Sequence, residues 1–209
     1  MTTTKTATTA AAAVRAARYD KKTALIVVDV QNDFAYAGGA LAVKGGEQIV
    51  GPVNREIAAA QAAGALVVYT QDWHPAHTPH FAPDGGIWPV HCVRDTWGAG
   101  FHPLLKVVGP VVRKGVHGED GYSGFTTADP KSGRKAPTEM AALLRKRGVD
   151  RVVVVGLATD YCVKATALDA VAAGFATRAI RRAMRAVNLR AGDGAVALAQ
   201  MRKAGVKVV

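Results

Sequence analysis

Short runs of apolar, mostly β-branched residues recur along the chain and alternate with stretches whose apolar residues follow helical spacing. The apolar runs predict strands at 23–30, 65–70, 110–114, 151–156, 175–180 and 206–209. The helical stretches, each followed by a glycine, predict helices at 47–63, 138–147, 161–173 and 193–204. Continuously apolar strands that alternate with helices are typical of a parallel sheet buried on both faces. The pattern therefore predicts a three-layer α/β/α fold around a central, mostly parallel, doubly wound sheet.

The chain of 209 residues contains no internal repeat, which favours one folded domain. We expect that domain to span residues 21–209. Residues 1–20 are rich in Thr and Ala and lack the compact apolar region of a secretory signal, so they are interpreted as a flexible N-terminal extension. No apolar run approaches the roughly 20 residues that cross a bilayer, and no membrane association is expected. With two cysteines there is no disulfide framework, which predicts a cytoplasmic location.

The composition is strongly basic, with a formal net charge of +11. The excess lies mostly in the C-terminal half, on predicted helices and loops at solvent-facing spacing, and no aromatic residues that could stack on bases are interleaved with it. We therefore interpret the charge as a solvated basic surface and expect no nucleic-acid partner. The sequence leaves open whether the protein forms a homo-oligomer.

Histidines are concentrated in one part of the chain. All six lie between His74 and His117, and four of them lie within the 20 residues that begin at Asp72. Prolines among them predict a shaped loop rather than a helix face. Imidazole and carboxylate are the usual ligands of a divalent transition metal, so this loop is a candidate metal site. The alternative is a polar loop whose histidines cap turns, and spacing alone does not separate ligands from bystanders such as His77.

Three chemically reactive residues, Asp29, Lys114 and Cys162, stand at or just after the ends of three predicted strands. Ligands of open parallel sheets bind beyond the carboxyl ends of the strands, so these side chains are expected to face a common crevice. A thiol at a helix N-terminus and near an ammonium is favoured as thiolate, and a neighbouring carboxylate can carry its proton. Each residue alone could be a core cysteine, a turn aspartate or a solvated lysine. Together they favour a nucleophilic site.

At these positions the chain resembles the nicotinamidase/pyrazinamidase family, which belongs to the cysteine hydrolases of the isochorismatase-like superfamily. The matching segments are ALIVVDVQNDF (24–34), YTQDWHPAHTPHF (69–81), WPVHC (88–92), VVRKG (111–115), YSGF (122–125) and VVVVGLATDYCVKATALDA (152–170). The resemblance covers about residues 22–209 in order and spacing. It implies the isochorismatase-like form of the α/β/α fold. It also implies an amidohydrolase that converts nicotinamide to nicotinate and ammonia in NAD salvage, and pyrazinamide to pyrazinoate.

The resemblance implies a role for each reactive residue. The nucleophile would be Cys162, with Asp29 as the carrier of its proton and Lys114 stabilising the charged pair. A cis peptide bond before the nucleophile, between Leu157 and Ala158, would aim the backbone N–H groups of Ala158 and Cys162 at an oxyanion.

The resemblance also implies the metal ligands and the walls of the pocket. One divalent metal ion, which could be zinc, iron or manganese, would be held by Asp72, His74, His80 and His91. The walls of a pyridine pocket would be Phe34, Trp88 and Tyr122. His77 and Cys92 then fall outside the ligand set, and His117 is expected on the surface.

Two alternatives stand beside this interpretation. Another cysteine hydrolase of the superfamily would act on an isochorismate-like ether or on a carbamoyl or ureido amide, but such relatives generally lack the metal-ligand set. A metal-stabilised binding protein without catalysis would account for the basic charge and predicts salt-sensitive nucleic-acid binding. Ammonia release from nicotinamide separates an amidohydrolase of this family from both.

Overall fold

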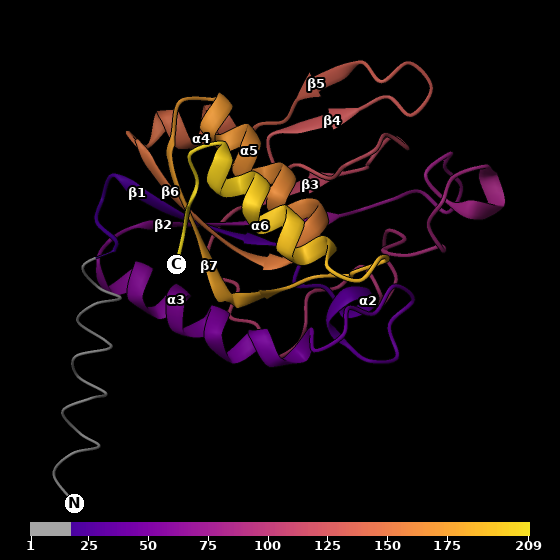
Figure 1. Cartoon of the computed structure of the whole chain (residues 1–209), viewed down its shortest axis with the longest axis horizontal. Coiled ribbons are helices and arrows are strands. Elements are labelled where there is room, and N and C mark those ends of the chain that lie inside the picture. The colour runs from indigo at the N-terminus through magenta and orange to yellow at the C-terminus, as the bar shows by residue number, and fades with distance from the viewer. Residues whose placement is uncertain (1–17) are drawn as a thin grey trace, which may run out of the picture.

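The central element of the protein is a sheet of six parallel strands, seen in a computed structural model that describes residues 18–209 (Figure 1). The strands lie in the order β3-β2-β1-β6-β7-β8, so the chain starts in the middle of the sheet and builds outward in both directions. They are β1 (Thr23–Val28), β2 (Leu66–Asp72), β3 (Val111–Lys114), β6 (Arg151–Leu157), β7 (Ala176–Arg185) and β8 (Lys207–Val208). The predicted parallel sheet is confirmed. Its order reverses between β1 and β6, where such sheets form a ligand crevice.

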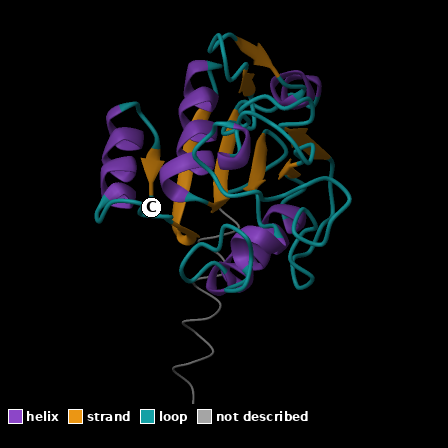
Figure 2. Ribbon diagram, turned by 90° about the vertical axis from the view of Figure 1, so that its right-hand side faces the viewer, coloured by secondary structure: helices purple, strands orange, loops and turns teal. Residues whose placement is uncertain are grey.

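Helices cover both faces of the sheet, as Figure 2 shows from a perpendicular direction. One face carries α3 (Val50–Ala62), which continues the 3-10 turn η1 (Glu47–Ile49) and packs against β1, β2 and β7. The opposite face carries α4 (Met140–Lys146), α5 (Lys164–Ala172) and α6 (Asp193–Lys203). The α/β/α fold class is thereby confirmed. No helix within residues 18–209 combines the length and apolarity that crossing a membrane requires.

Strand β1 shows why the apolar runs contain no polar interruption. Leu25 and Val27 pack into the core on the α3 side, while Ala24 and Ile26 pack into the core on the opposite side, and all four are fully buried. Successive side chains of a strand point to opposite faces, so a strand that is covered on both faces must be apolar at every position. Burying each Val, Leu or Ile side chain contributes about 1.5–3 kcal/mol relative to leaving it exposed.

A glycine allows β6 to lie close to β1 and to shift its register against β7. Gly156 has a φ of 117°, and a Cβ at this position would collide with the backbone of Val28. The β6–β7 pairing shifts after Val154 and resumes at Met184, so β7 runs to Arg185. The expected end of this strand at residue 180 was wrong, because outward-facing arginines interrupt the apolar run without ending the backbone pairing.

Several short elements do not follow from the periodicity of the sequence. They are α2 (Asn32–Ala35), the 3-10 turn η2 (Ala82–Asp84), the antiparallel hairpin of β4 (Thr126–Ala128) and β5 (Lys135–Pro137), and the π-helical turn η3 (Thr159–Val163). Elements of three to five residues are too short to show a period, and all residues of β5 are exposed, so no apolar pattern marks this strand. Figure 1 shows the hairpin standing apart from the main sheet. The helix expected from residue 161 begins with the π-helical turn at Thr159.

The residues just before the expected domain boundary at residue 21 contact the folded domain. Residues 1–17 of the expected extension lie outside the described residues. Tyr19, however, is only 5% exposed, and its hydroxyl donates a hydrogen bond to Glu56 at 2.9 Å. Arg18 and Arg182 pair with the same fully buried carboxylate, which needs such partners because an unpaired buried charge is strongly destabilising. The chain therefore contacts the domain from Arg18 onward, ahead of the expected boundary at residue 21.

Candidate active site

The ends of three strands bring Asp29, Lys114 and Cys162 together at the carboxyl edge of the sheet. Asp29 follows β1, Lys114 ends β3 and Cys162 lies in the turn after β6. Lys114 Nζ lies 2.8 Å from Asp29 Oδ2 and 3.7 Å from Cys162 Sγ. Asp29 and Lys114 are completely buried, while Cys162 is 8% exposed. A carboxylate, an ammonium and a thiol thus form one cluster, and the thiol is its accessible member.

Asp29 leaves β1 in the left-handed region of backbone conformation, with a φ of 48°. This conformation is uncommon for a residue other than glycine. The Asp29 backbone N–H donates to Thr70 O at 3.3 Å, and Asp29 Oδ1 accepts a hydrogen bond from the Thr70 hydroxyl at 2.6 Å. Strand β2 therefore fixes the carboxylate and leaves Oδ2 free to face Lys114. The turn also ends β1 at Val28, before the expected end at residue 30.

Burial dominates the electrostatics of these groups. It raises the pKa of Asp29 to about 6, although the Lys114 ammonium opposes the shift. Burial also raises the pKa of the Cys162 thiol well above its usual range; Lys114 opposes this shift and Asp29 adds to it. Burial works against the charge of Lys114, but the carboxylates of Asp29 and Asp72 outweigh it and raise the pKa of Lys114. Burial therefore opposes the thiolate that the sequence alone favours, and Lys114 is the group that works in favour of it.

Asp72, the last residue of β2, links this cluster to the histidines. Its Oδ1 contacts Lys114 Nζ, and its Oδ2 lies 3.9 Å from His74 Nε2. The buried amide of Gln31 holds the Asp72 backbone: Gln31 Oε1 accepts the Asp72 N–H at 2.8 Å, and Gln31 Nε2 donates to Asp72 O at 2.8 Å. Gln31 Nε2 also donates to Ala99 O at 2.9 Å, which fixes the long loop to the same point.

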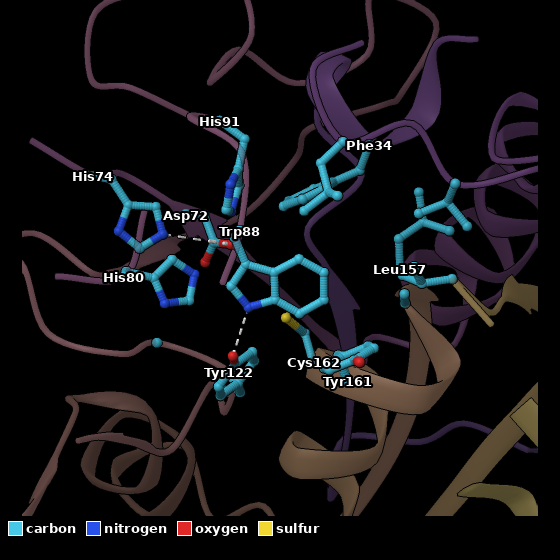
Figure 3. Close-up of a pocket in the computed structure, with 15 residues that line it drawn as sticks. Phe34, Asp72, His74, His80, Trp88, His91, Tyr122, Leu157, Tyr161 and Cys162 are labelled. Carbon is cyan, nitrogen blue, oxygen red and sulfur yellow. Dashed lines mark hydrogen bonds and ion pairs between the residues drawn. The ribbon is translucent and has the colours of Figure 1, made fainter. Parts of the chain in front are cut away.

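Three imidazoles gather beside Asp72 at one end of a pocket (Figure 3). One ring nitrogen from each of His74, His80 and His91 lies within 4.8 Å of the others, and all three residues are buried. Burial lowers the pKa of His74 to about 4 and also lowers the pKa of His91, so both rings are neutral at neutral pH and keep a free lone pair. Buried imidazoles beside a carboxylate are a donor set that fits a divalent transition metal.

Contacts on the outer side orient two of the three rings. His91 Nδ1 lies 2.7 Å from Pro89 O, and His80 Nδ1 lies 2.6 Å from Asp120 Oδ1. Because a carbonyl or a carboxylate accepts the proton on Nδ1, the lone pair of each ring is left on Nε2. Outer contacts of this kind are the usual way in which proteins fix the tautomer and orientation of a metal-binding histidine.

His74 packs against the glycine that follows Lys114. Gly115 has a φ of 74°, and a Cβ at this position would collide with the His74 ring. The His74 ring stacks on that of His80, with ring centroids 4.9 Å apart and an interplanar angle of 17°. His74 Nδ1 is buried and has no hydrogen-bond partner among residues 18–209. Any larger residue at position 115 would push this ring out of the cluster.

The remaining histidines and the second cysteine lie outside the cluster. The His77 side chain is 87% exposed and lies 3.4 Å from Asp84 Oδ1, and His117 is also exposed. His102 is buried but stacks on Tyr36, which follows α2, away from the other imidazoles. Cys92 is fully buried and is not among the residues whose ligand atoms converge. The structure therefore separates the candidate ligands from the bystanders, which spacing alone could not do.

An aromatic pocket opens beside the thiol and the imidazoles (Figure 3). Phe34, Trp88 and Tyr122 line it, and Trp88 Nε1 donates a hydrogen bond to the Tyr122 hydroxyl at 2.7 Å. Tyr161 extends this wall, with its ring edge-on to Trp88 at a centroid distance of 4.9 Å. The pocket is therefore suited to a flat aromatic ring whose substituent reaches Cys162.

The peptide bond between Leu157 and Ala158 is cis, as the resemblance implies. It leads into the π-helical turn, in which the N–H groups of Tyr161 and Val163 each donate to Ala158 O at 3.1 Å. Ala158 and Cys162 both line the pocket. The backbone of these two residues thus lies beside any carboxamide that reaches the thiol.

Comparisons with known proteins agree with this arrangement. The Isochorismatase domain matches residues 23–209. The nicotinamidase/pyrazinamidase of Mycobacterium tuberculosis is 44% identical over 195 residues, which are 89% of this chain and 97% of that protein. The chain belongs to the nicotinamidase/pyrazinamidase family. Membership of this family makes the protein an amidohydrolase, and the alternative of a binding protein without catalysis is wrong.

Solved structures of nicotinamidase/pyrazinamidase family members share the fold. The pyrazinamidase of Pyrococcus horikoshii, in complex with zinc, has a TM-score of 0.80 and 41% identity, covering 90% of this chain and 98% of that one. The L. infantum protein PnC1, in complex with nicotinate, has a TM-score of 0.82 and 36% identity, covering 90% of this chain and 92% of that one.

Several residues that shape this site do not follow from the sequence reasoning. Gln31 contacts Asp72, and Thr70 contacts Asp29. Asp120 contacts His80, and Tyr161 contacts Trp88. Gln31, Thr70 and Tyr161 carried a signal, because all three lie inside segments that match the nicotinamidase/pyrazinamidase family. Thr70 ends the apolar run of β2 and looked like an ordinary strand residue. Asp120 lies in a loop without periodicity, and its contact with a residue 40 positions away is visible only in the structure.

Proposed function

We propose that this protein hydrolyses nicotinamide to nicotinate and ammonia, and pyrazinamide to pyrazinoate, through a thioester on Cys162. The observation that carries the proposal is the position of the thiol. It lies beside the buried pair of Asp29 and Lys114 and opens into an aromatic pocket that also contains three imidazoles. A relative is named for both activities, and another relative binds nicotinate. Nicotinate released in this way would enter NAD salvage.

The first half of the reaction forms the thioester. The Cys162 thiol passes its proton to Asp29, one carboxylate oxygen of which lies within 4.8 Å of the sulfur. Lys114 stabilises the thiolate as it forms, because its ammonium lies near both groups. The sulfur attacks the carboxamide carbon, and the carbonyl electrons move onto oxygen. When the C–N bond breaks, Asp29 gives its proton to the departing ammonia.

The second half hydrolyses the thioester. A water molecule attacks the carbonyl carbon while Asp29 takes one of its protons, and the C–S bond then breaks to release the acid. The proton on Asp29 returns to the sulfur of Cys162, which restores the thiol. In both halves the oxyanion is held by the backbone N–H groups of Ala158 and Cys162. One donor of this kind typically contributes about 10²–10³ in rate.

The imidazole end of the pocket supports an aromatic nitrogen heterocycle as the substrate. The residues placed to hold a divalent metal ion are Asp72, His74, His80 and His91, and zinc, iron or manganese each accepts such donors. A metal ion bound there supplies a Lewis acid for the ring nitrogen of the substrate. The zinc in the Pyrococcus horikoshii pyrazinamidase supports this assignment. Phe34, Trp88 and Tyr122 hold the ring so that the carboxamide faces the thiol.

Ammonia release from a panel of amides tests the proposed function. Nicotinamide and pyrazinamide are the expected substrates, and Cys162→Ala is expected to abolish turnover while elemental analysis shows unchanged metal content. Turnover of carbamoyl or ureido amides alone would indicate a different hydrolase of the isochorismatase-like superfamily. Turnover by Cys162→Ala would contradict the thioester.

The basic surface has no part in the proposed chemistry. We propose that it is solvated, and the cytoplasmic location and the lack of a nucleic-acid partner stay predictions from the sequence. Binding through phosphate contacts is strongest at low salt, so gel filtration with duplex DNA at low salt is the most sensitive test. The expected result is that the protein elutes at the same volume with and without DNA.

A further inference from the structure

The β4–β5 hairpin reaches the imidazoles through one residue of the preceding loop. Ala128, the last residue of β4, exchanges two backbone hydrogen bonds with Asp120: Asp120 N–H donates to Ala128 O at 2.7 Å, and Ala128 N–H donates to Asp120 O at 2.8 Å. The hairpin therefore fixes the backbone of Asp120 from outside the main sheet. This gives a functional context to an element that has no place in the six-stranded sheet.

The side chain of Asp120 is directed at one of the candidate metal ligands. Asp120 Oδ1 lies 2.6 Å from His80 Nδ1, and the two side chains are 31% and 5% exposed. Pro89 O, a neutral acceptor, occupies the same position on the ring of His91. Within residues 18–209, His80 is the one of the three imidazoles whose outer nitrogen, Nδ1, faces a carboxylate. The carboxylate accepts the Nδ1 proton and leaves the lone pair on Nε2.

Charge provides a second argument for Asp120. Within residues 18–209, the charged residues buried around the imidazoles include Asp29, Asp72 and Lys114, which form one ion-paired cluster, and Asp33, whose charge acts on His91. A divalent cation bound by the imidazoles would add two positive charges to this buried region. The carboxylate of Asp120, which contacts the His80 ring, would attract that charge at close range, where the surrounding protein screens charge less well than water does.

We propose that Asp120 is a positioning residue for the metal site: it fixes the His80 ring with Nε2 available to the ion and supplies a compensating negative charge. The inference rests on the metal site of the proposed function. It adds to that function a residue that does not touch the metal ion or the amide and that acts through His80.

The chain also contains a matched control for this contact. The exposed His77 lies 3.4 Å from Asp84 Oδ1 in the same loop, so it forms a second histidine–aspartate pair outside the cluster. Asp84→Asn removes one negative charge beside a histidine, as Asp120→Asn does. In the unsubstituted protein the Thr78 N–H donates a hydrogen bond to Asp84 Oδ2 at 2.9 Å. The amide oxygen of the asparagine in Asp84→Asn can still accept this hydrogen bond.

The experiment measures the dissociation constant for zinc of the full-length protein, by competition with a chromophoric chelator. Asp120→Ala is expected to raise it by about 10–100-fold, the usual effect of removing an outer partner of a metal ligand. Asp120→Asn is expected to raise it by less, because an amide oxygen still accepts the Nδ1 proton but carries no charge. Asp84→Asn is expected to leave it unchanged. At saturating zinc, hydrolysis of nicotinamide by Asp120→Asn should return close to that of the unsubstituted protein.

Two results would overturn the inference. The first is a zinc dissociation constant that is the same in both Asp120 variants as in Asp84→Asn. The second is a weakened zinc affinity in Asp120→Asn together with a loss of stability in the metal-free protein, where the loss in free energy of unfolding equals the loss in free energy of zinc binding. This result would show a purely structural role for Asp120. An unsubstituted protein that binds zinc but does not hydrolyse nicotinamide would refute the proposed function and leave the comparison at Asp120 intact. An unsubstituted protein that binds no zinc would refute both.

Discussion

The proposed catalytic trio of Asp29, Lys114 and Cys162 and the imidazole cluster of His74, His80 and His91 lie at the same crevice, but different parts of the fold hold them. Each member of the trio lies at or just after the end of a strand, so the hydrogen-bonded sheet sets the position of its backbone. His80 and His91 lie in the long loop between β2 and β3. Their rings are instead oriented by individual contacts.

This difference predicts how each region responds to amino-acid substitutions. A change in the trio removes a reacting group or leaves buried charges unpaired, and no addition to the solution replaces it. A change in the imidazole cluster weakens the binding of an ion, so its effect depends on metal concentration. Substitutions in the two regions should therefore separate into those that excess metal rescues and those that it does not.

The largest effect is expected from Asp29→Asn. The amide has nearly the same shape but cannot carry the thiol proton to ammonia, and general acid–base groups typically contribute 10²–10⁴-fold. We expect kcat for nicotinamide to fall by about 10⁴-fold because Asp29 serves in both halves of the reaction. Zinc affinity should stay close to that of the unsubstituted protein. Ammonia release at saturating zinc measures the effect, and a loss of less than tenfold would contradict the assigned role.

Lys114→Met should lower stability as well as activity. The substitution leaves the buried carboxylates of Asp29 and Asp72 without their ammonium partner. Removing one member of a buried charge pair typically destabilises a protein by about 3–5 kcal/mol. Urea unfolding measures the change in the free energy of unfolding. Lys131→Met, at an exposed position, is the control and is expected to stay within about 0.5 kcal/mol.

His80→Ala should act on the other region. We expect the zinc dissociation constant to rise by at least about 100-fold, because the loss of a ligand should exceed the 10–100-fold effect of losing an outer partner. The KM for nicotinamide should rise with it, while the alkylation rate of Cys162 by iodoacetamide stays nearly constant. His77→Ala, in the same loop, is the matched control and should change neither quantity. Equal effects of the two substitutions would show that His80 is not a ligand.

Tyr122→Phe should give the smallest effect. It removes the acceptor of the Trp88 Nε1 hydrogen bond and leaves the aromatic ring in place. The net contribution of such a bond is about 0.5–1.5 kcal/mol, so KM should rise several-fold with little change in kcat. Steady-state kinetics with nicotinamide measure both constants. A fall in kcat with unchanged KM would move Tyr122 from binding to the reaction itself.

The sequence predicted the parts of the molecule that repeat a regular pattern. Strands that are apolar at every position predicted the buried sheet, and Asp29, Lys114 and Cys162 could be identified because strand ends meet at one edge. The arginines of β7 concealed the last five residues of that strand. The state of the thiol did not follow from the sequence, because the burial and the carboxylates that raise the pKa of Cys162 are visible only in the structure.

The contacts between loops could not be predicted in the same way. Spacing indicated a metal site but did not distinguish His80 from His77, three residues earlier. That distinction depends on burial, which a loop acquires from its contacts with distant segments. Asp120 is the clearest example. Its partner His80 lies on the other side of β3 in the sequence, and the hairpin that holds the Asp120 backbone shows no periodicity.

The central claim is that the trio performs the chemistry through a covalent acyl group on Cys162. Acid quenching of the enzyme during turnover of nicotinamide, followed by mass spectrometry of the Cys162 peptide, tests it most directly. The account predicts a nicotinoyl thioester on Cys162 that forms within one turnover, decays as substrate is exhausted and is absent from Cys162→Ala. Steady ammonia release with no acyl group on Cys162, and with full turnover retained in Cys162→Ala, would contradict the account.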